Sequence, residues 1–199
     1  GAEQVVTHDV LGPCDGPWAL MATATGSIAD VTLFAEAVVQ GGTDKLFVEP
    51  DATHPLGYRT TTREAVTASA SVGGRYRYTS DDGLLSVSIA AQYFVNGLAY
   101  ADPLLFVDDP TALAYALGQI DAGVLASSDL ADRGRHNGAA RVVLDDIGGS
   151  DLTPSVLWLG NLSDGSGVVQ AEVAYTGIDH VTLAVGFRDV YGPDGAEYS

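Results

Sequence analysis

The sequence predicts an all-β protein whose long antiparallel strands follow one another up and down. One observation is a hairpin between Glu64 and Asn96, in which apolar side chains recur at every second position, the period of a strand. Its arms are joined by residues 79–83, a composition typical of a turn. A second observation is that the connections between predicted strands are short, except for two long segments that fall on alternate connections. We therefore expect a meander of hairpins.

The two arms of this hairpin have unlike faces. One face carries Ala, Val, Ile, Leu and aromatic side chains, and the other carries Ser, Thr, Gly and Arg. The alternation holds for roughly 11 to 13 residues in each arm, whereas soluble strands are usually about 5 to 6 residues long and a tilted membrane-crossing strand needs about 9 to 11. The arms therefore have the length of transmembrane strands.

At this length and with these faces, the hairpin resembles those of bacterial outer-membrane β-barrel proteins, the porin-like class. The resemblance is one of class, extends over most of the chain through the strand pattern, and involves no invariant motif. It implies an antiparallel up-and-down transmembrane β-barrel, formed by residues 1–199 as a single domain or a fragment of one. Because a soluble sheet with one wet face alternates in the same way, a secreted or surface β-sandwich that binds a glycan or protein through its long loops stays an alternative.

The elements before the hairpin are less regular. Residues 1–17 are rich in residues that break regular structure and are expected to form a loop or terminal arm. Alternation over 18–25 and 31–39 predicts the first two strands, joined by a turn at Gly26-Ser27-Ile28. Residues 41–63 show no sustained periodicity and form an unusually long connection for a compact soluble domain. In a barrel they would be an external loop.

The segment after the hairpin, residues 97–137, contains a helix signal. Asp109-Pro110 resembles an N-cap followed by proline at the first helical position. The apolar residues that follow return at helical spacing and are Leu113, Leu117, Ile120 and Val124. A short amphipathic helix is expected there, and Ser127-Ser128 is expected to cap a further turn or two.

The last third returns to strands. Alternation and turn compositions predict them over 139–147, 154–163, 167–177 and 180–191, which brings the total to about eight, the number that closes the smallest barrels. The two long segments then lie at the same end of the sheet, as the outer loops of such barrels do. The residues after 191 read as a loop, whereas these barrels usually end in a strand with a terminal aromatic residue. The chain is therefore expected to stop before its closing strand, and the parent barrel can be larger.

Composition and motifs narrow the classes of function. Asp and Glu number 26 against 9 Lys and Arg, a net charge of −17 that disfavours nucleic acid as a partner. There is a single cysteine, and the 4 histidines show no metal-ligand spacing. No nucleophile elbow, phosphate loop or dinucleotide motif occurs, and acidic pairs such as Asp108-Asp109 are typical of turns and caps. We expect no enzymatic activity, no metal and no cofactor, with membrane lipid and small solutes as partners.

Strand alternation assigns the candidate functional residues. The expected lumen-facing residues are Glu36, Thr67, Ser69, Ser71, Arg75, Arg77, Gln92, Glu172 and Arg188. The expected lipid-facing residues are Val66, Ala68, Ala70, Val87, Ile89, Val173, Leu183 and Val185. The expected interfacial aromatic residues are Tyr76, Tyr78, Tyr93, Tyr175, Phe187 and Tyr191. In a pore the charged residues among the first group would set the field of the lumen; in a small closed barrel they would pair across strands, and in a soluble sheet they would face water.

Overall fold

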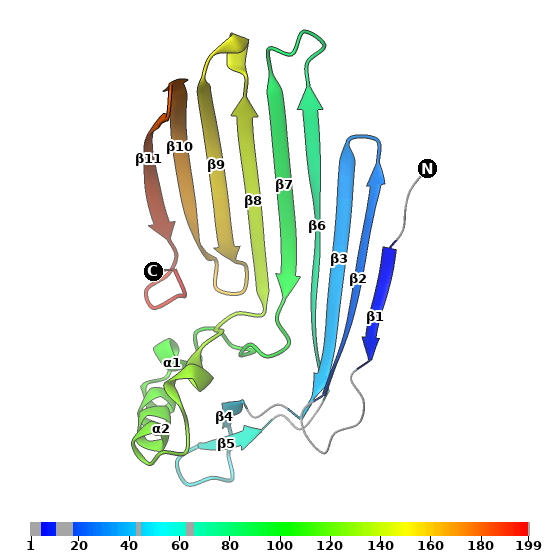
Figure 1. The fold of residues 1–199 in the computed structure, drawn as a ribbon. Coiled ribbons are helices and arrows are strands. Elements are labelled where there is room, and N and C mark those ends of the chain that lie inside the picture. The colour runs from blue at the N-terminus through cyan, green and yellow to red at the C-terminus, as the bar shows by residue number, and fades with distance from the viewer. Residues whose placement is uncertain (1–4, 11–17, 43–44, 63–65, 199) are drawn as a thin grey trace.

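The computed structural model describes residues 5–10, 18–42, 45–62 and 66–198, which form one large antiparallel sheet with a smaller lobe at one of its ends (Figure 1). The large sheet has nine strands in the order β1-β2-β3-β6-β7-β8-β9-β10-β11. Its strands are β1 (Val5–Val10), β2 (Trp18–Ile28), β3 (Val31–Gly41), β6 (Thr67–Thr79), β7 (Ser86–Val95), β8 (His136–Asp145), β9 (Leu152–Asn161), β10 (Ser166–Ile178) and β11 (Val181–Tyr191). The predicted antiparallel, all-β meander is confirmed.

The sheet is open at both edges. Within the described chain, β1 pairs only with β2 and β11 pairs only with β10, so the strands do not close into a barrel. Strands β2, β3 and β6 to β11 are 10 to 13 residues long, which is roughly twice the usual length in soluble proteins. Every strand predicted after residue 17 is present, with ends that shift by a few residues.

Two predictions near the N-terminus are wrong in part. Residues 5–10, expected in a loop, form β1 against β2, while residues 11–17, which hold the glycine and proline run, lie outside the described residues. The first turn is not at Gly26-Ser27-Ile28, because β2 continues to Ile28 and Gly26 pairs with Leu33. The chain reverses instead at Ala29, which takes the left-handed conformation with φ 51°.

The smaller lobe is built from the two long connections. It contains the hairpin of β4 (Leu46–Pro50) and β5 (Tyr58–Thr62), the helices α1 (Leu105–Asp108) and α2 (Pro110–Asp121), and the 3₁₀ turn η1 (Ser127–Leu130). A further short 3₁₀ turn, η2 (Ile147–Gly149), connects β8 to β9 at the opposite end of the sheet. Both long connections lie at the same end of the sheet, as predicted (Figure 1). The absence of regular structure expected over 41–63 is wrong, since β4 and β5 pair there.

The helix predicted in the second long connection is confirmed, but its predicted apolar stripe is wrong in part, because Leu113, Leu117 and Val124 are exposed and the buried residues of α2 are Ala112 and Ala116. Asp109 is the N-cap of α2, and its side chain accepts hydrogen bonds from the backbone N–H groups of Thr111, at 2.8 Å, and Ala112, at 3.2 Å. Helix α2 and β4 supply half of the lobe's hydrophobic core, whose buried members are Phe47, Val48, Tyr58, Tyr100, Phe106, Ala112, Ala116 and Leu125. The lobe is therefore a small structure with an interior of its own.

Candidate functional site

The register of the large sheet sorts its side chains into two faces. Residues directly opposite each other in neighbouring antiparallel strands share a face. Ala37, Ala70 and Val95 are successive partners across β3, β6 and β7, and so are their neighbours Glu36, Ser71 and Phe94 on the other side. Following such partners from β2 to β11 defines an apolar face, which contains Ala70, and a polar face, which contains Ser71.

The apolar face has almost no charge and is open. Among Asp, Glu, Lys and Arg, the register of β2 to β11 places only Asp189 on it, close to the end of β11. Large apolar side chains on this face are exposed, with Ile28 at 69 %, Val185 at 74 % and Phe187 at 62 %. A broad apolar surface thus runs across the sheet without a second layer of the described chain on top of it.

The residues predicted to face lipid share this face. Ala68, Ala70, Val87, Ile89, Val173, Leu183 and Val185 all lie on it. Val66 lies directly before β6 and is also exposed. The six aromatic residues predicted at interfaces lie on the same face, with Tyr76, Tyr78 and Tyr175 towards the tight turns and Tyr93, Phe187 and Tyr191 towards the lobe.

Two tryptophans that the sequence prediction did not include also lie on the apolar face. Trp18 and Trp158 sit in β2 and β9 towards the lobe end, and the indole N–H of Trp158 donates a hydrogen bond to the Tyr191 hydroxyl at 2.6 Å. Both rings lie over glycine: a Cβ at Gly41 would be 2.7 Å from Trp18 Nε1, and one at Gly160 would be 2.5 Å from Trp158 Cζ2. Trp18 and Gly41 are direct cross-strand partners, a pairing that could have identified Trp18, whereas Gly160 is two residues from Trp158 in the same strand.

The polar face carries all of the residues predicted to face a lumen. Glu36, Thr67, Ser69, Ser71, Arg75, Arg77, Gln92, Glu172 and Arg188 lie on it, although Thr67 and Ser71 are largely buried between their neighbours. Arg141, which was not predicted, shares the face through its pairing with Ala90. The charged side chains are brought to one surface of the sheet, and they come from β3, β6, β8, β10 and β11.

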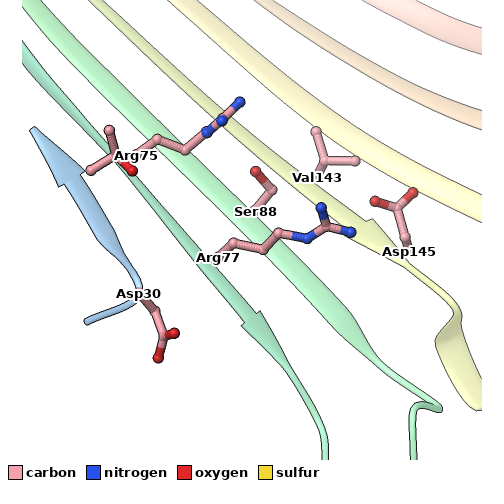
Figure 2. Close-up of a pocket in the computed structure, with 7 residues that line it drawn as sticks. Asp30, Arg75, Arg77, Ser88, Val143 and Asp145 are labelled. Atoms are coloured by element: carbon pink, nitrogen blue, oxygen red, sulfur yellow. The ribbon is translucent and has the colours of Figure 1, made fainter. Parts of the chain in front are cut away.

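A shallow hollow marks the polar face near the tight turns. Its volume is about 330 Å³, and it is lined by Asp30, Thr32, Arg75, Arg77, Ser88, Val143 and Asp145. Figure 2 shows Arg75 and Arg77 extending from β6 across β7 towards β8, where Asp145 lies. Neither arginine forms an ion pair with any residue in the described ranges. Their charges are therefore available to a solute.

Within the described part of the chain, no three His, Cys, Asp or Glu side chains gather as metal ligands would. Two ionisable groups with shifted pKa values meet in the lobe, where the Tyr58 hydroxyl donates a hydrogen bond to the Asp109 carboxylate. This bond lowers the pKa of Asp109, with help from the Ala112 and Thr111 amides, and raises the pKa of Tyr58. The pair joins β5 to α2 and stabilises the lobe.

Hydropathy and similarity give two further findings. No helix in the described ranges is both long and apolar enough to cross a membrane. No protein-family model, curated protein or solved structure matches the chain.

Proposed function

We propose that the protein forms a large part of a transmembrane β-barrel in a bacterial outer membrane, and that its polar face lines a porin-like path for small solutes. The observation that carries this proposal is the separation of side chains across the full width of the sheet, from β2 to β11. Strands of 10 to 13 residues also meet the length of about 9 to 11 residues that a tilted strand needs to cross hydrocarbon. No enzymatic activity and no cofactor form part of the proposal.

The openness of the apolar face supports lipid as its environment. Exposed apolar surface in water costs about 25 cal/mol per Å², and soluble monomers rarely expose patches larger than a few hundred Å². The apolar face extends over eight consecutive strands of the sheet order, and residues such as Val185 and Phe187 are more than half exposed. Lipid acyl chains would remove this cost without any second protein layer.

The aromatic residues support an orientation. Tyr and Trp are enriched where a membrane meets water, and here they gather towards both ends of the apolar face. Trp18, Trp158 and Tyr191 mark the lobe end, whereas Tyr76 and Tyr175 mark the end with tight turns. The lobe, which has its own core, would then stand in water beyond the lipid on the side of the long loops.

The soluble β-sandwich is less well supported. In a sandwich the apolar face packs on a second sheet about 10 Å away. The second sheet of this structure, β4 with β5, lies beyond the ends of the long strands (Figure 1). It leaves side chains such as Ile28 and Val185 exposed.

Tryptophan quenching by lipid tests the proposal on matched neighbours. Trp18 and Trp158 are the only two tryptophans in the chain, so replacing both by phenylalanine gives a silent background. In this background we compare Tyr93→Trp with Phe94→Trp, because these aromatic residues are adjacent in β7 and lie on the apolar and polar faces respectively. Both variants are reconstituted into vesicles whose acyl chains carry bromine, which quenches indole fluorescence on contact.

Each face has its own expected response. We expect strong quenching of Tyr93→Trp by brominated lipid and weak quenching of Phe94→Trp, which iodide in water should quench instead. Equal quenching of both variants by lipid, or of neither, would contradict the assignment of the apolar face to lipid. A compact monomer that stays in solution without detergent would contradict the membrane proposal altogether.

A further inference from the structure

Three arginines of the polar face are aligned in one row across the sheet. Residues that are direct partners form a row perpendicular to the strands. Starting in β3 and ending in β11, this row contains Thr32, Arg75, Ala90, Arg141, Leu157, Gln170 and Arg188. Only Arg75 and Arg188 were predicted from sequence as polar-face residues. Their alignment with Arg141 depends on the register of five strand pairs.

The spacing of this arginine row brings Arg75 and Arg141 close together, whereas Arg188 lies three strands beyond Arg141, about 14 Å away. Neighbouring strands lie about 4.8 Å apart, so the backbones of Arg75 and Arg141, separated by β7 alone, are about 10 Å apart. Ala90 between them is small and leaves space above the sheet. Arg77 adds a fourth cation one same-face position along β6. The result is a band of positive charge that starts at the hollow seen in Figure 2.

Acidic side chains on the polar face do not neutralise the row. Glu36 and Asp145 are each two same-face positions from it, in β3 and β8, and Glu172 is one position away in β10, diagonal to Arg188. Asp30, in the turn before β3, lines the same hollow as Arg75 and Arg77. None of them forms an ion pair with an arginine of the row in the described structure. The guanidinium groups of Arg75, Arg141 and Arg188 belong to exposed residues. The charged side chains of the polar face therefore do not form the ion pairs that would fill the interior of a small closed barrel.

The distribution of charge across the chain gives independent support. From β2 to β11 the polar face carries four of the 9 basic residues, Arg75, Arg77, Arg141 and Arg188, but only three of the 26 acidic ones, Glu36, Asp145 and Glu172. These strand positions have a net charge of +1, and Asp30, in the turn before β3 and lining the same hollow as Arg75 and Arg77, brings the balance to zero in a chain whose net charge is −17. The polar face is therefore far less acidic than the chain as a whole, and its basic residues are gathered in and beside the arginine row.

We infer that the arginine row makes the proposed path selective for small anions that carry phosphate or carboxylate groups. Arginine stays charged at any physiological pH, and its planar donors match the oxygens of phosphate and carboxylate groups. Rings of arginine or lysine select anions in pores. This inference rests on the proposed function, since the row can select only a solute that passes it.

Reversal potentials in planar bilayers test the inference. The protein, purified in detergent at its full chain length, is inserted between unequal KCl solutions, and the permeability ratio of chloride to potassium is obtained from the voltage at zero current. The charge-removing variants are Arg75→Gln and Arg75→Gln/Arg141→Gln. Arg75→Lys/Arg141→Lys keeps the charge. Arg59→Gln removes one exposed arginine from the lobe and serves as the matched control.

The native protein should prefer chloride. Each arginine removed from the row should lower the chloride-to-potassium ratio by up to about sixfold, because a unit charge some 8 Å away in water changes the local concentrations of chloride and potassium by a little over twofold each, in opposite directions. The lysine double variant and Arg59→Gln should keep the native ratio. Inorganic phosphate should reduce the chloride current of the native protein more than that of the glutamine double variant.

The outcomes separate the two proposals. Currents that prefer potassium, or whose preference is unchanged by the glutamine double variant, would overturn the anion inference and leave solute passage standing. If correctly inserted protein, verified by lipid quenching, conducts no current, the proposed solute path is wrong and the inference falls with it.

Discussion

The lobe and the large sheet differ in whether their large apolar side chains are buried. In the lobe Phe47 is 0 % exposed and Val48 is 1 % exposed, whereas in the sheet Phe187 and Val185 are exposed by 62 % and 74 %. The lobe encloses Phe47 and Val48 in a core between a hairpin and a helix, but the sheet is a single layer. The sheet is therefore not short of apolar residues; in the described chain it has no protein surface to bury them against.

The forces that stabilise the two regions differ accordingly. In the lobe, Tyr100 makes edge-to-face contacts with Phe47 at 5.4 Å and Phe106 at 5.2 Å between ring centroids, and its hydroxyl accepts a hydrogen bond from the Val48 amide. In the sheet, the backbone ladders between β2 and β11 provide most of the contacts. The lobe should thus respond to changes of packing, and the sheet to changes of the surrounding medium.

The largest effect is expected from replacing the buried Phe47, with the exposed Phe187 as the comparison. Phe47→Ala removes a fully buried ring and should destabilise the lobe by about 3 to 5 kcal/mol. Phe187→Ala on the apolar face leaves no cavity, because lipid can refill the space, and should cost roughly half as much. Amide hydrogen exchange in vesicles measures both regions at once. A larger loss of protection in Phe187→Ala would mean that this ring is packed against protein.

A smaller effect is expected from two adjacent alanines in the middle of β7. Ala91 lies on the apolar face and Ala90 lies between Arg75 and Arg141 on the polar face. Ala91→Glu should destabilise the protein in vesicles by up to about 2 kcal/mol, because the carboxylate enters lipid. Ala90→Glu should be close to neutral, since its charge meets two arginines. Urea unfolding in vesicles checks the difference, and equal costs would show that the faces share one environment.

Removing the hydrogen bond between Trp158 and Tyr191, at the lobe end of the apolar face, should have a smaller effect. Tyr191→Phe removes the acceptor of the Trp158 indole N–H and should cost about 0.5 to 1.5 kcal/mol. Tyr175→Phe is the control, because the Tyr175 hydroxyl forms no hydrogen bond with another described residue. The two variants can be compared by the same urea titration, together with the red shift of Trp158 emission. If Tyr191→Phe does not lower the stability, this bond does not stabilise the lobe end of the apolar face.

The smallest effect concerns pH and is confined to the lobe. Because the pKa of Asp109 is lowered by its bond from Tyr58, the carboxylate stabilises the lobe above its unfolded pKa, and this contribution is lost as pH falls through the folded pKa. The raised pKa of Tyr58 gives the reverse at high pH: its contribution is present below the unfolded value and is lost as pH rises through the folded one. Tyr58→Phe should flatten both limbs of lobe stability, measured by hydrogen exchange against pH.

The sequence was most informative where a period of two persists over many residues. This period predicted the eight long strands, β2, β3 and β6 to β11, and their two faces, because slipping a strand by one residue would exchange its faces. The period was less useful for β4, where Leu46, Phe47 and Val48 form a continuous apolar run that is buried on several sides. The Ala29 turn was missed because alanine in a left-handed conformation gives no signal comparable to glycine.

The arginine row illustrates what sequence patterns alone leave undetermined. The alternation in β6, β8 and β11 indicates which face each arginine occupies, but not its height along the sheet. That height depends on the lengths of the turns and on the register of every intervening strand pair. Arg141 and Arg188 are brought level only through Leu157 and Gln170, whose side chains themselves give no hint of it. Edge strand β1 was missed for a related reason, since its pairing with β2 is not evident from its own residues.

The open edge at β11 bears on how such a protein would enter a bilayer. Strand β11 has 11 residues, and its outward backbone groups have no partner strand in the described chain. In hydrocarbon each unpaired N–H or C=O group costs several kcal/mol. A partly inserted sheet would therefore be a high-energy intermediate, and strands could not cross one after another on their own. Insertion should be a single cooperative event, with its rate set by whatever pairs the terminal strand while the sheet crosses the headgroup region.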